Sequence, residues 1–308
     1  MHAALALALL GSASASASTL QLPFRRLEHN ITNLSLDLLA RATPALRASN
    51  DPCVDGYVLD VLVGTPPQPM SLRSPDYRSG KILFGGIDAA QFTGPLSTVP
   101  LLPDHGPSFA VSVEGISLDG DNNNSSSSAL PAVSGRAILE ANSENMALPP
   151  ALAHAINRRY GVVGVPCSFL NYTYYIADCG LRERLAHESI SVRFAGGVAV
   201  KVPLGQLVIP YVNAATEERA LEMIRDDPAH PMASWDGRCA WTLRPIEEAG
   251  ENEGDDWILG APFMRSAYVV FDTLNKQVGL AQAKSGAVSD DAETRIVPIP
   301  KDAKHFPA

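Results

Sequence analysis

The chain has 308 residues, of which 46% are hydrophobic and 19% are charged, and its formal net charge is -9. This composition is typical of a globular protein with one large or two moderate domains and a core of useful size. An acidic balance without a cluster of Lys and Arg argues against a nucleic-acid-binding protein.

The first 18 residues have the features of a secretory signal peptide. An apolar run at residues 3–10 is followed by small residues that resemble a signal cleavage site. The run is too short to cross a bilayer, and no later apolar stretch reaches the required length. We therefore expect a secreted protein without a transmembrane segment; a buried N-terminal helix is the alternative.

Glycosylation sequons and cysteines agree with secretion. N-x-Ser/Thr sequons accept glycan in the secretory lumen, and here they contain Asn30, Asn33, Asn123, Asn124 and Asn171. Four cysteines suit an oxidising compartment. Because no spacing of His and Cys in the sequence matches a zinc site, we expect neither a metal nor a cofactor.

Residues 19–50 show little strand pattern and contain the dibasic pair Arg25-Arg26. A propeptide cleaved after Arg26 and a pair of surface arginines are equally good interpretations. From Tyr57 onward the pattern changes. Apolar residues alternate over 57–63, which predicts a strand, and the prolines of the following GTPPQ end its pairing.

The rest of the chain reads as mostly β with short helices. Residues 81–101 predict a strand, a Gly-Gly turn and another strand, and Pro149-Pro150 and Gly161 delimit a short helix. Further strands are expected at 109–113, 190–194 and 198–202, and a hairpin at 268–281. The polar stretch at 119–130 and the acidic stretch at 247–256 are interpreted as solvated loops.

Three segments resemble landmarks of the pepsin-like aspartic peptidases, particularly the fungal secreted members, and they occur in the same order as in that family. They are Tyr57 through GTPPQ, GKILFGGID with FTGPL at 80–96, and WILGAPFMRSAYVVFD with LNKQVGLAQA at 257–283. The resemblance covers residues 51–285 and implies a mostly β, pepsin-like (acid protease) β-barrel fold in two lobes. A secreted β-rich binding protein unrelated to peptidases would explain the composition but not these ordered segments.

The resemblance also implies a domain organisation, in which the second lobe is largely complete and the first lobe is a remnant. We expect a signal peptide at 1–18, a candidate propeptide at 19–50, the first-lobe remnant at 51–118, a polar loop and lobe boundary at 119–130, the second lobe at 131–285 and a polar C-terminal tail at 286–308.

Enzymes of this family hold a water between two aspartates, one in each lobe, within D-T-G or D-S-G loops. Two carboxyl groups so close share one proton, because both cannot ionise. The sequence contains neither motif. Only a dozen residues separate Gln68 from Gly80, where the first catalytic loop and the substrate-covering flap belong, so the first loop is interpreted as deleted.

In the second lobe the resemblance places Glu140 at the aspartate position, within AILEANSENMALPP. Asn142 stands where the family has glycine, and Ser143 keeps the loop hydroxyl. Glutamate moves the carboxyl group by one methylene, and a misplacement of about 1 Å can cost roughly a hundredfold in rate. We therefore expect a secreted member of the aspartic endopeptidase family, a hydrolase family that acts on polypeptides, whose catalysis is impaired.

Three alternatives stay open. The chain is a non-catalytic pseudo-peptidase that binds peptides or proteins, an acid endopeptidase that uses Glu140 and a second carboxylate, or an incomplete gene product of an intact endopeptidase.

The resemblance assigns structural roles to several other residues. It implies a second-lobe disulfide between Cys179 and Cys239, which would close a loop of about 60 residues and stabilise the fold by about 4 kcal/mol. Cys53 and Cys167 either pair with each other or remain free thiols. Tyr268 is expected in the core and Asp272 at a hairpin turn.

Overall fold

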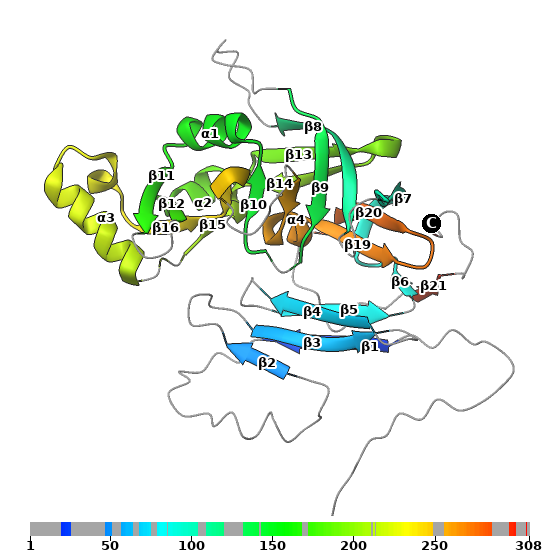
Figure 1. Cartoon of the computed structure of the whole chain (residues 1–308). Helices are drawn as coiled ribbons and strands as arrows, with labels where there is room; N and C mark the ends of the chain where they lie inside the picture. Colours follow the sequence, from blue (N-terminus) through cyan, green and yellow to red (C-terminus); the bar gives the residue numbers. More distant parts are fainter. Residues whose placement is uncertain are drawn as a thin grey trace, which may run out of the picture.

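The computed structural model describes residues 20–25, 47–50, 57–63, 68–74, 79–84, 86–103, 109–119, 132–141, 143–167, 172–210, 212, 214–248, 256–284, 296–299 and 306. Strands dominate these residues and helices are short and peripheral (Figure 1), as expected for a mostly β, pepsin-like fold. No helix in these ranges has the length and apolarity needed to cross a membrane.

The strands up to residue 119 are β1 (Leu20–Arg25), β2 (Arg47–Asn50), β3 (Tyr57–Val63), β4 (Gln68–Ser74), β5 (Ser79–Phe84), β6 (Gly86–Asp88), β7 (Phe92–Pro100) and β8 (Ala110–Asp119). The later strands are β9 (Gly135–Leu139), β10 (Met146–Leu148), β11 (Val163–Cys167), β12 (Tyr172–Asp178), β13 (Ser189–Phe194), β14 (Ala199–Pro203), β15 (Val208–Ile209), β16 (Arg238–Trp241), β17 (Leu243–Pro245), β18 (Trp257–Leu259), β19 (Ala267–Asp272), β20 (Gln277–Ala283) and β21 (Ile296–Pro298). The α-helices are α1 (Pro150–Arg159), α2 (Leu181–Arg184), α3 (Ala214–Asp226) and α4 (Ala261–Ser266), and the 3-10 turns are η1 (Ala195–Gly197), η2 (Leu204–Leu207), η3 (Pro231–Ser234) and η4 (Ile246–Glu248).

A seven-stranded sheet in the order β14-β13-β8-β9-β18-β10-β17 forms the centre of the molecule. Ile190, Val192 and Phe194 alternate along β13 and are each 0% exposed, so the face of the strand that carries them packs against a core. They belong to one large apolar cluster that also includes Leu148 and Leu259 from the middle of the sheet.

The short helix expected between the prolines and Gly161 is α1. Pro150 occupies its first turn, where a missing N–H costs nothing, and Gly161 follows its end at a φ of 66°. Leu152, Ala153 and Ile156 are fully buried. The helix packs against β17 and β10 and covers that end of the sheet.

The expected hairpin is β19 and β20, and β7 pairs with the other edge of β20. Asp272 ends β19 and is 8% exposed. Its carboxylate accepts hydrogen bonds from Asn275 Nδ2 at 2.7 Å and Gln277 Nε2 at 2.9 Å, which closes the turn. Tyr268 packs 4.9 Å, ring centroid to ring centroid, from Phe92. Both residues therefore have the structural roles expected from the sequence.

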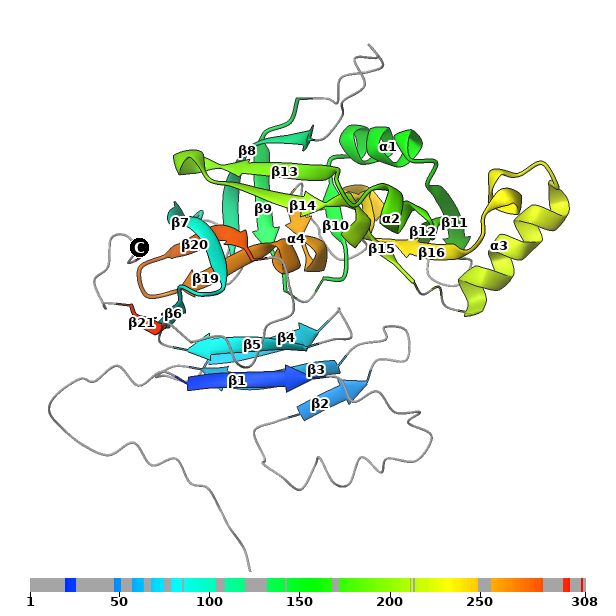
Figure 2. The same ribbon diagram turned by 180° about the vertical axis from the view of Figure 1, so that it is seen from behind.

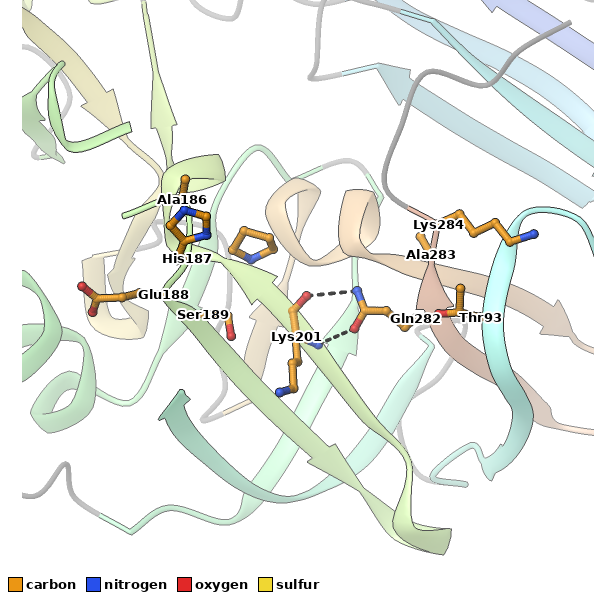
Figure 3. Close-up of a pocket in the computed structure, with 10 residues that line it drawn as sticks. Thr93, Ala186, His187, Glu188, Ser189, Lys201, Gln282, Ala283 and Lys284 are labelled. Atoms are coloured by element: carbon orange, nitrogen blue, oxygen red, sulfur yellow. Dashed lines mark hydrogen bonds between the residues drawn. The ribbon is translucent and has the colours of Figure 1, made fainter. Parts of the chain in front are cut away.

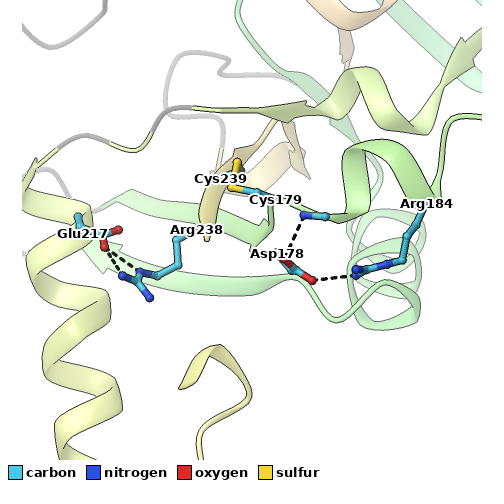
Figure 4. The surroundings of a disulfide bond; sticks show 7 residues. Asp178, Cys179, Arg184, Glu217, Arg238 and Cys239 are labelled. Atoms are coloured by element: carbon cyan, nitrogen blue, oxygen red, sulfur yellow. Dashed lines mark hydrogen bonds and ion pairs between the residues drawn. A yellow bond between two sulfur atoms is a disulfide. The ribbon is translucent and has the colours of Figure 1, made fainter. Parts of the chain in front are cut away.

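A second, four-stranded sheet in the order β11-β12-β16-β15 carries α3 on one side. A disulfide joins Cys179, just after β12, to Cys239 in β16, which is the pair that the resemblance implied. Figure 4 shows one ion pair on each side of it. Asp178 binds Arg184 at 2.9 Å, and Glu217 of α3 accepts from Arg238 Nε at 2.8 Å.

The N-terminal residues contain strands that the sequence pattern did not indicate. β1 pairs antiparallel with β5 from Leu20↔Phe84 to Arg25↔Ser79, and β2 pairs with β3. Pro23 interrupts the pattern within β1, and β1 depends on a partner more than 50 residues later in the sequence, which local periodicity cannot reveal. Figures 1 and 2 show β1 to β5 as a layer beside β6, β19 and β20.

Three further observations bear on the expectations from the sequence. The polar segment expected as a lobe boundary separates β8 from β9 in the sequence, and these two strands pair with each other. Asp256, expected in a solvated loop, is only 8% exposed. The expected polar tail contributes β21, which pairs with β6, and the buried Phe306.

Several predictions fall outside the described residues. These are the signal peptide at 1–18, the sequon residues Asn30, Asn33, Asn123, Asn124 and Asn171, the cysteine Cys53 and the loop residue Asn142. Cys167 is the last residue of β11.

Candidate active-site loop

The residues matched to the second catalytic loop lie where a chain connection crosses the end of a strand. β18 lies between β9 and β10, parallel to β9 and antiparallel to β10. β9 and β10 therefore run in opposite directions, and the connection between them, residues 140–145, passes the carboxyl end of β18. This topology brings Glu140 and Ser143 together with the WILGAP segment, which is more than a hundred residues later in the sequence.

Gly260 allows this crossing. A Cβ atom at this position would lie 2.5 Å from the carbonyl oxygen of Ser143 and closer still to that of Asn145. The backbone of Ala261 donates a hydrogen bond to the same Ser143 carbonyl at 2.7 Å, and Glu140 N donates to Leu259 O at 3.2 Å. Two backbone hydrogen bonds and a close approach that only glycine permits thus attach the loop to the end of β18.

Ser143 holds the loop in its turn conformation. Its backbone N–H donates to the carbonyl of Glu140 at 3.2 Å. Its hydroxyl donates to the carbonyl of Asn145 at 3.1 Å and accepts from the amide of Asn145 at 3.3 Å. The hydroxyl is therefore engaged with the loop's own backbone, a local pattern that is common for Ser in tight turns. Glu140, at the start of the loop, is half-buried.

The segment in which the first catalytic loop is expected from the sequence is short. β4 ends at Ser74 and β5 begins at Ser79, and β4 pairs along its whole length with β3, from Tyr57↔Ser74 to Val63↔Gln68. Across the described ranges, no group of three or more His, Cys, Asp or Glu is arranged to hold a metal ion.

An ion pair at the start of β9 and β18, the end of these strands away from the loop, was not anticipated from the sequence. Arg136 Nε donates to Asp256 Oδ1 at 2.7 Å. The two residues directly precede Ala137 and Trp257, which are paired in the parallel ladder of β9 and β18. Each charge is unremarkable in the sequence, so the pair would have been found only by anticipating that these two strands lie side by side.

Two tyrosines, the half-buried Tyr160 and the buried Tyr175, bind carboxylates. Tyr160 donates to Glu188 at 2.7 Å and Tyr175 donates to Glu248 at 2.9 Å. Burial, followed by the neighbouring glutamate, raises the pKa of each phenol above its ordinary value. Burial likewise raises the pKa of Tyr268, whose hydroxyl accepts from the amide of Asp88. These tyrosines are neutral structural groups.

An open pocket of about 540 Å³ lies beside β13, β14 and β20 (Figure 3). His187, Glu188, Lys201 and Lys284 are among the residues that line it, and neither Glu140 nor Ser143 does. The amide of Gln282 binds both backbone groups of Lys201, accepting from N at 2.8 Å and donating to O at 3.1 Å. The pocket is therefore separate from the loop that matches the catalytic position.

Comparison with known proteins agrees with this topology. The family model of eukaryotic aspartyl proteases matches residues 48–283. The chain is 29% identical over 221 residues to an acid protease of Saccharomycopsis fibuligera, covering 69% of this chain and 45% of that protein. It is 26% identical over 216 residues to secreted aspartic protease 6 of Candida albicans, covering 69% and 41%.

Similarity extends to aspartic proteinase yapsin-3 of Saccharomyces cerevisiae, 28% identical over 240 residues, with 74% of this chain and 39% of that protein covered. The chain thus spans less than half of the length of these relatives. The matched region runs from β2 to β20 and includes both strands that flank the candidate loop. The chain therefore belongs to the pepsin-like family of eukaryotic aspartyl proteases.

Proposed function

We propose that this chain is a secreted member of the aspartic endopeptidase family in which catalysis is impaired. The observation that carries the proposal is the sequence of the candidate loop: Glu140 occupies the position of the second aspartate, and no D-T-G or D-S-G motif occurs in the chain. The family's chemistry requires two carboxyl groups that share one proton, and a single carboxyl cannot supply both the base and the acid.

The attachment of the loop supports a fixed position for the misplaced carboxyl group. Glu140 N binds Leu259 O, and the turn that follows is held against Gly260 by Ser143 and Ala261. Because the backbone is tied at these points, the extra methylene of Glu140 displaces the carboxyl group rather than the loop. Catalysis depends on placement within about 1 Å, so this displacement is costly even where a second carboxylate is present.

Secretion is part of the proposal. The apolar run at 3–10 followed by small residues, together with the N-x-Ser/Thr sequons, supports passage through the secretory pathway. The disulfide between Cys179 and Cys239 suits the oxidising conditions met there. One of the relatives is itself named a secreted aspartic protease.

A proteolysis assay tests the proposal. The purified full chain is incubated at pH 3–5 with an acid-denatured protein, with and without a transition-state peptide analogue. We expect no analogue-sensitive cleavage above that of the Glu140→Gln variant. Glu218→Gln, at an exposed position of α3, is the matched control. Analogue-sensitive cleavage that survives in Glu218→Gln and disappears in Glu140→Gln would overturn the proposal and identify an active endopeptidase.

The same assay separates two related interpretations. Binding of the analogue without cleavage, measured by calorimetry, would support a non-catalytic peptide-binding pseudo-peptidase. Sequencing the transcript across codons 68–80 tests whether the chain is an incomplete product of a gene that encodes an intact endopeptidase. A D-T-G or D-S-G loop encoded there would restore one half of the dyad, whereas Glu140 would still occupy the other.

A further inference from the structure

Ile299 and Phe306 pack against an apolar surface, here called the groove, that lies outside the candidate active-site loop. The groove is formed by β6, β7 and β20, and its floor includes Ile87, Leu96 and Ala281, which are 1%, 7% and 1% exposed. Phe306, near the end of the chain, belongs to the same cluster and is 6% exposed. An aromatic side chain buried this deeply within an apolar cluster makes a specific contact.

The groove is shaped for that phenylalanine. Gly279, in the middle of β20, has no side chain, and a Cβ atom there would lie 2.9 Å from two atoms of the Phe306 ring. Thr98 is the residue paired with Gly279 across the sheet, and its Oγ1 accepts a hydrogen bond from Phe306 N at 3.4 Å. The missing side chain on one strand and the hydroxyl on the next thus form a seat for one aromatic residue.

A short strand provides the second point of attachment. β21 pairs antiparallel with β6 through Ile296↔Asp88, Val297↔Ile87 and Pro298↔Gly86 (Figure 2). Ile299, directly after β21, packs against the same apolar cluster as Phe306. The attachment therefore follows the general mode of peptide recognition by strand addition, in which backbone pairing gives affinity and a side-chain pocket gives specificity.

We propose that this groove is an exchangeable peptide-binding site, occupied in each chain by its own C-terminal segment and able to accept the same segment from a second copy. Among the described residues, three residue pairs and the side chains of Ile299 and Phe306 attach the segment, and the intrinsic affinity of these contacts is modest. Its occupancy depends on the high effective concentration that covalent linkage provides, in the millimolar range for short linkers.

Geometry permits the exchange between copies. The segment follows β20 in the sequence, and an extended chain from Lys284 to Ile296 reaches up to roughly 40 Å. This distance suffices for the segment to leave its own groove and enter that of a neighbouring molecule. Exchange of an identical element in this way is a low-cost route to dimers, since every contact made in the monomer is reproduced in the dimer. The segment, unlike the groove, lies outside the family match, since residues 296–306 follow its end at 283.

A peptide-binding measurement on the full chain tests the proposal. A fluorescent synthetic peptide with the sequence of residues 295–308 is titrated with the wild-type chain and with Phe306→Ala, and binding is followed by anisotropy. The variant weakens the resident segment without altering the groove. We expect the peptide to bind Phe306→Ala at least tenfold more tightly than the wild-type chain, because it no longer competes with an intact resident segment.

Two controls define the site. A peptide with alanine in place of its phenylalanine should bind Phe306→Ala at least tenfold more weakly than the native peptide. Leu274→Ala, in the hairpin turn and 69% exposed, should behave as the wild-type chain. Circular dichroism confirms that each variant is folded, and Phe306→Leu, a milder change, replaces Phe306→Ala if the latter does not fold.

Equal affinity of the native peptide for the wild-type chain and the variant would overturn the proposal, as would absence of saturable binding to the folded variant. Equal binding of the alanine peptide would show that the seat over Gly279 is not what recognises the segment. None of these outcomes depends on proteolytic activity, so the inference stands or falls separately from the proposed function.

Discussion

The backbone amide of Ala261 donates a 2.7 Å hydrogen bond to the carbonyl oxygen of Ser143, joining two segments more than a hundred residues apart in the sequence. Gly260, one residue earlier, makes this approach sterically possible. The family's characteristic WILGAP segment thus determines where the candidate loop lies, while the identity of residue 140 determines what chemistry the loop can perform. The two properties are encoded by different segments, so the position of the loop does not depend on the identity of residue 140.

Replacing Gly260 with alanine should destabilise the protein by about 3 kcal/mol, the upper range for overpacking, because the new Cβ would meet two backbone carbonyls that cannot move independently. Gly161→Ala is the control. Nothing lies within 4 Å of a Cβ there, and the positive φ alone should cost about 1 kcal/mol. Urea unfolding followed by circular dichroism measures both. Equal losses of unfolding free energy in the two variants would contradict a specific steric requirement for glycine at position 260.

The ion pair between Arg136 and Asp256 should contribute to stability because its carboxylate is largely buried, with a side chain only 11% exposed. Asp256→Asn should lower the free energy of unfolding by about 1–3 kcal/mol, since it weakens charge-assisted hydrogen bonding at a buried position. Asp119→Asn, which affects the more exposed pair with Lys201, should cost under about 1 kcal/mol. Thermal unfolding of the two variants at one pH tests whether Asp256→Asn is the more destabilising, and equal destabilisation would contradict a larger contribution from the buried pair.

Alkaline pH should weaken the fold through Tyr175. Its pKa is raised above the ordinary value near 10 by burial first and then by Glu248, so the unfolded chain loses this proton more readily than the folded one. The stabilisation is complete below pH 10 and is lost as the pH rises toward the folded pKa. Tyr175→Phe should show a shallower decline of unfolding free energy above pH 10. An unchanged slope would contradict a buried, titrating phenol.

Removing the disulfide between Cys179 and Cys239, which are 60 residues apart, should cost about 4 kcal/mol in the chain-entropy model. The double variant Cys179→Ala/Cys239→Ala should have the same denaturant midpoint with and without a reducing agent. The wild-type chain should move toward that midpoint only when it is reduced. A wild-type midpoint that is insensitive to complete reduction would argue against a stabilising role.

Local patterns predicted the elements that depend on nearby residues. Proline at the start of α1 and Gly161 after its end were sufficient to locate that helix, and Asp272 marked the turn between β19 and β20. The pairing of Cys179 with Cys239 came from the family resemblance. In each case the informative residues lie within the element or within a motif.

The features that were missed depend on distant partners. β1 contains Pro23 and lies in a segment without clear alternation, and it forms because β5 lies beside it. In the sequence Asp256 is one of several charges in an acidic stretch, and only the parallel pairing of β9 with β18 places Arg136 next to it. Phe306 is a single aromatic residue in a polar tail, and its burial depends on an apolar cluster and on the bare backbone at Gly279, which are distant in sequence.

The contact of Gln282 with β14 has a consequence for behaviour at high concentration. β14 is the outermost strand of the central sheet, and such strands can recruit strands from other molecules into intermolecular aggregates. The side-chain amide of Gln282 satisfies both the N–H and the carbonyl of Lys201, imitating the next strand at that point. Because these two backbone groups are already hydrogen-bonded, another molecule cannot pair with them to extend the sheet, and Gln282 thus opposes self-association at this edge.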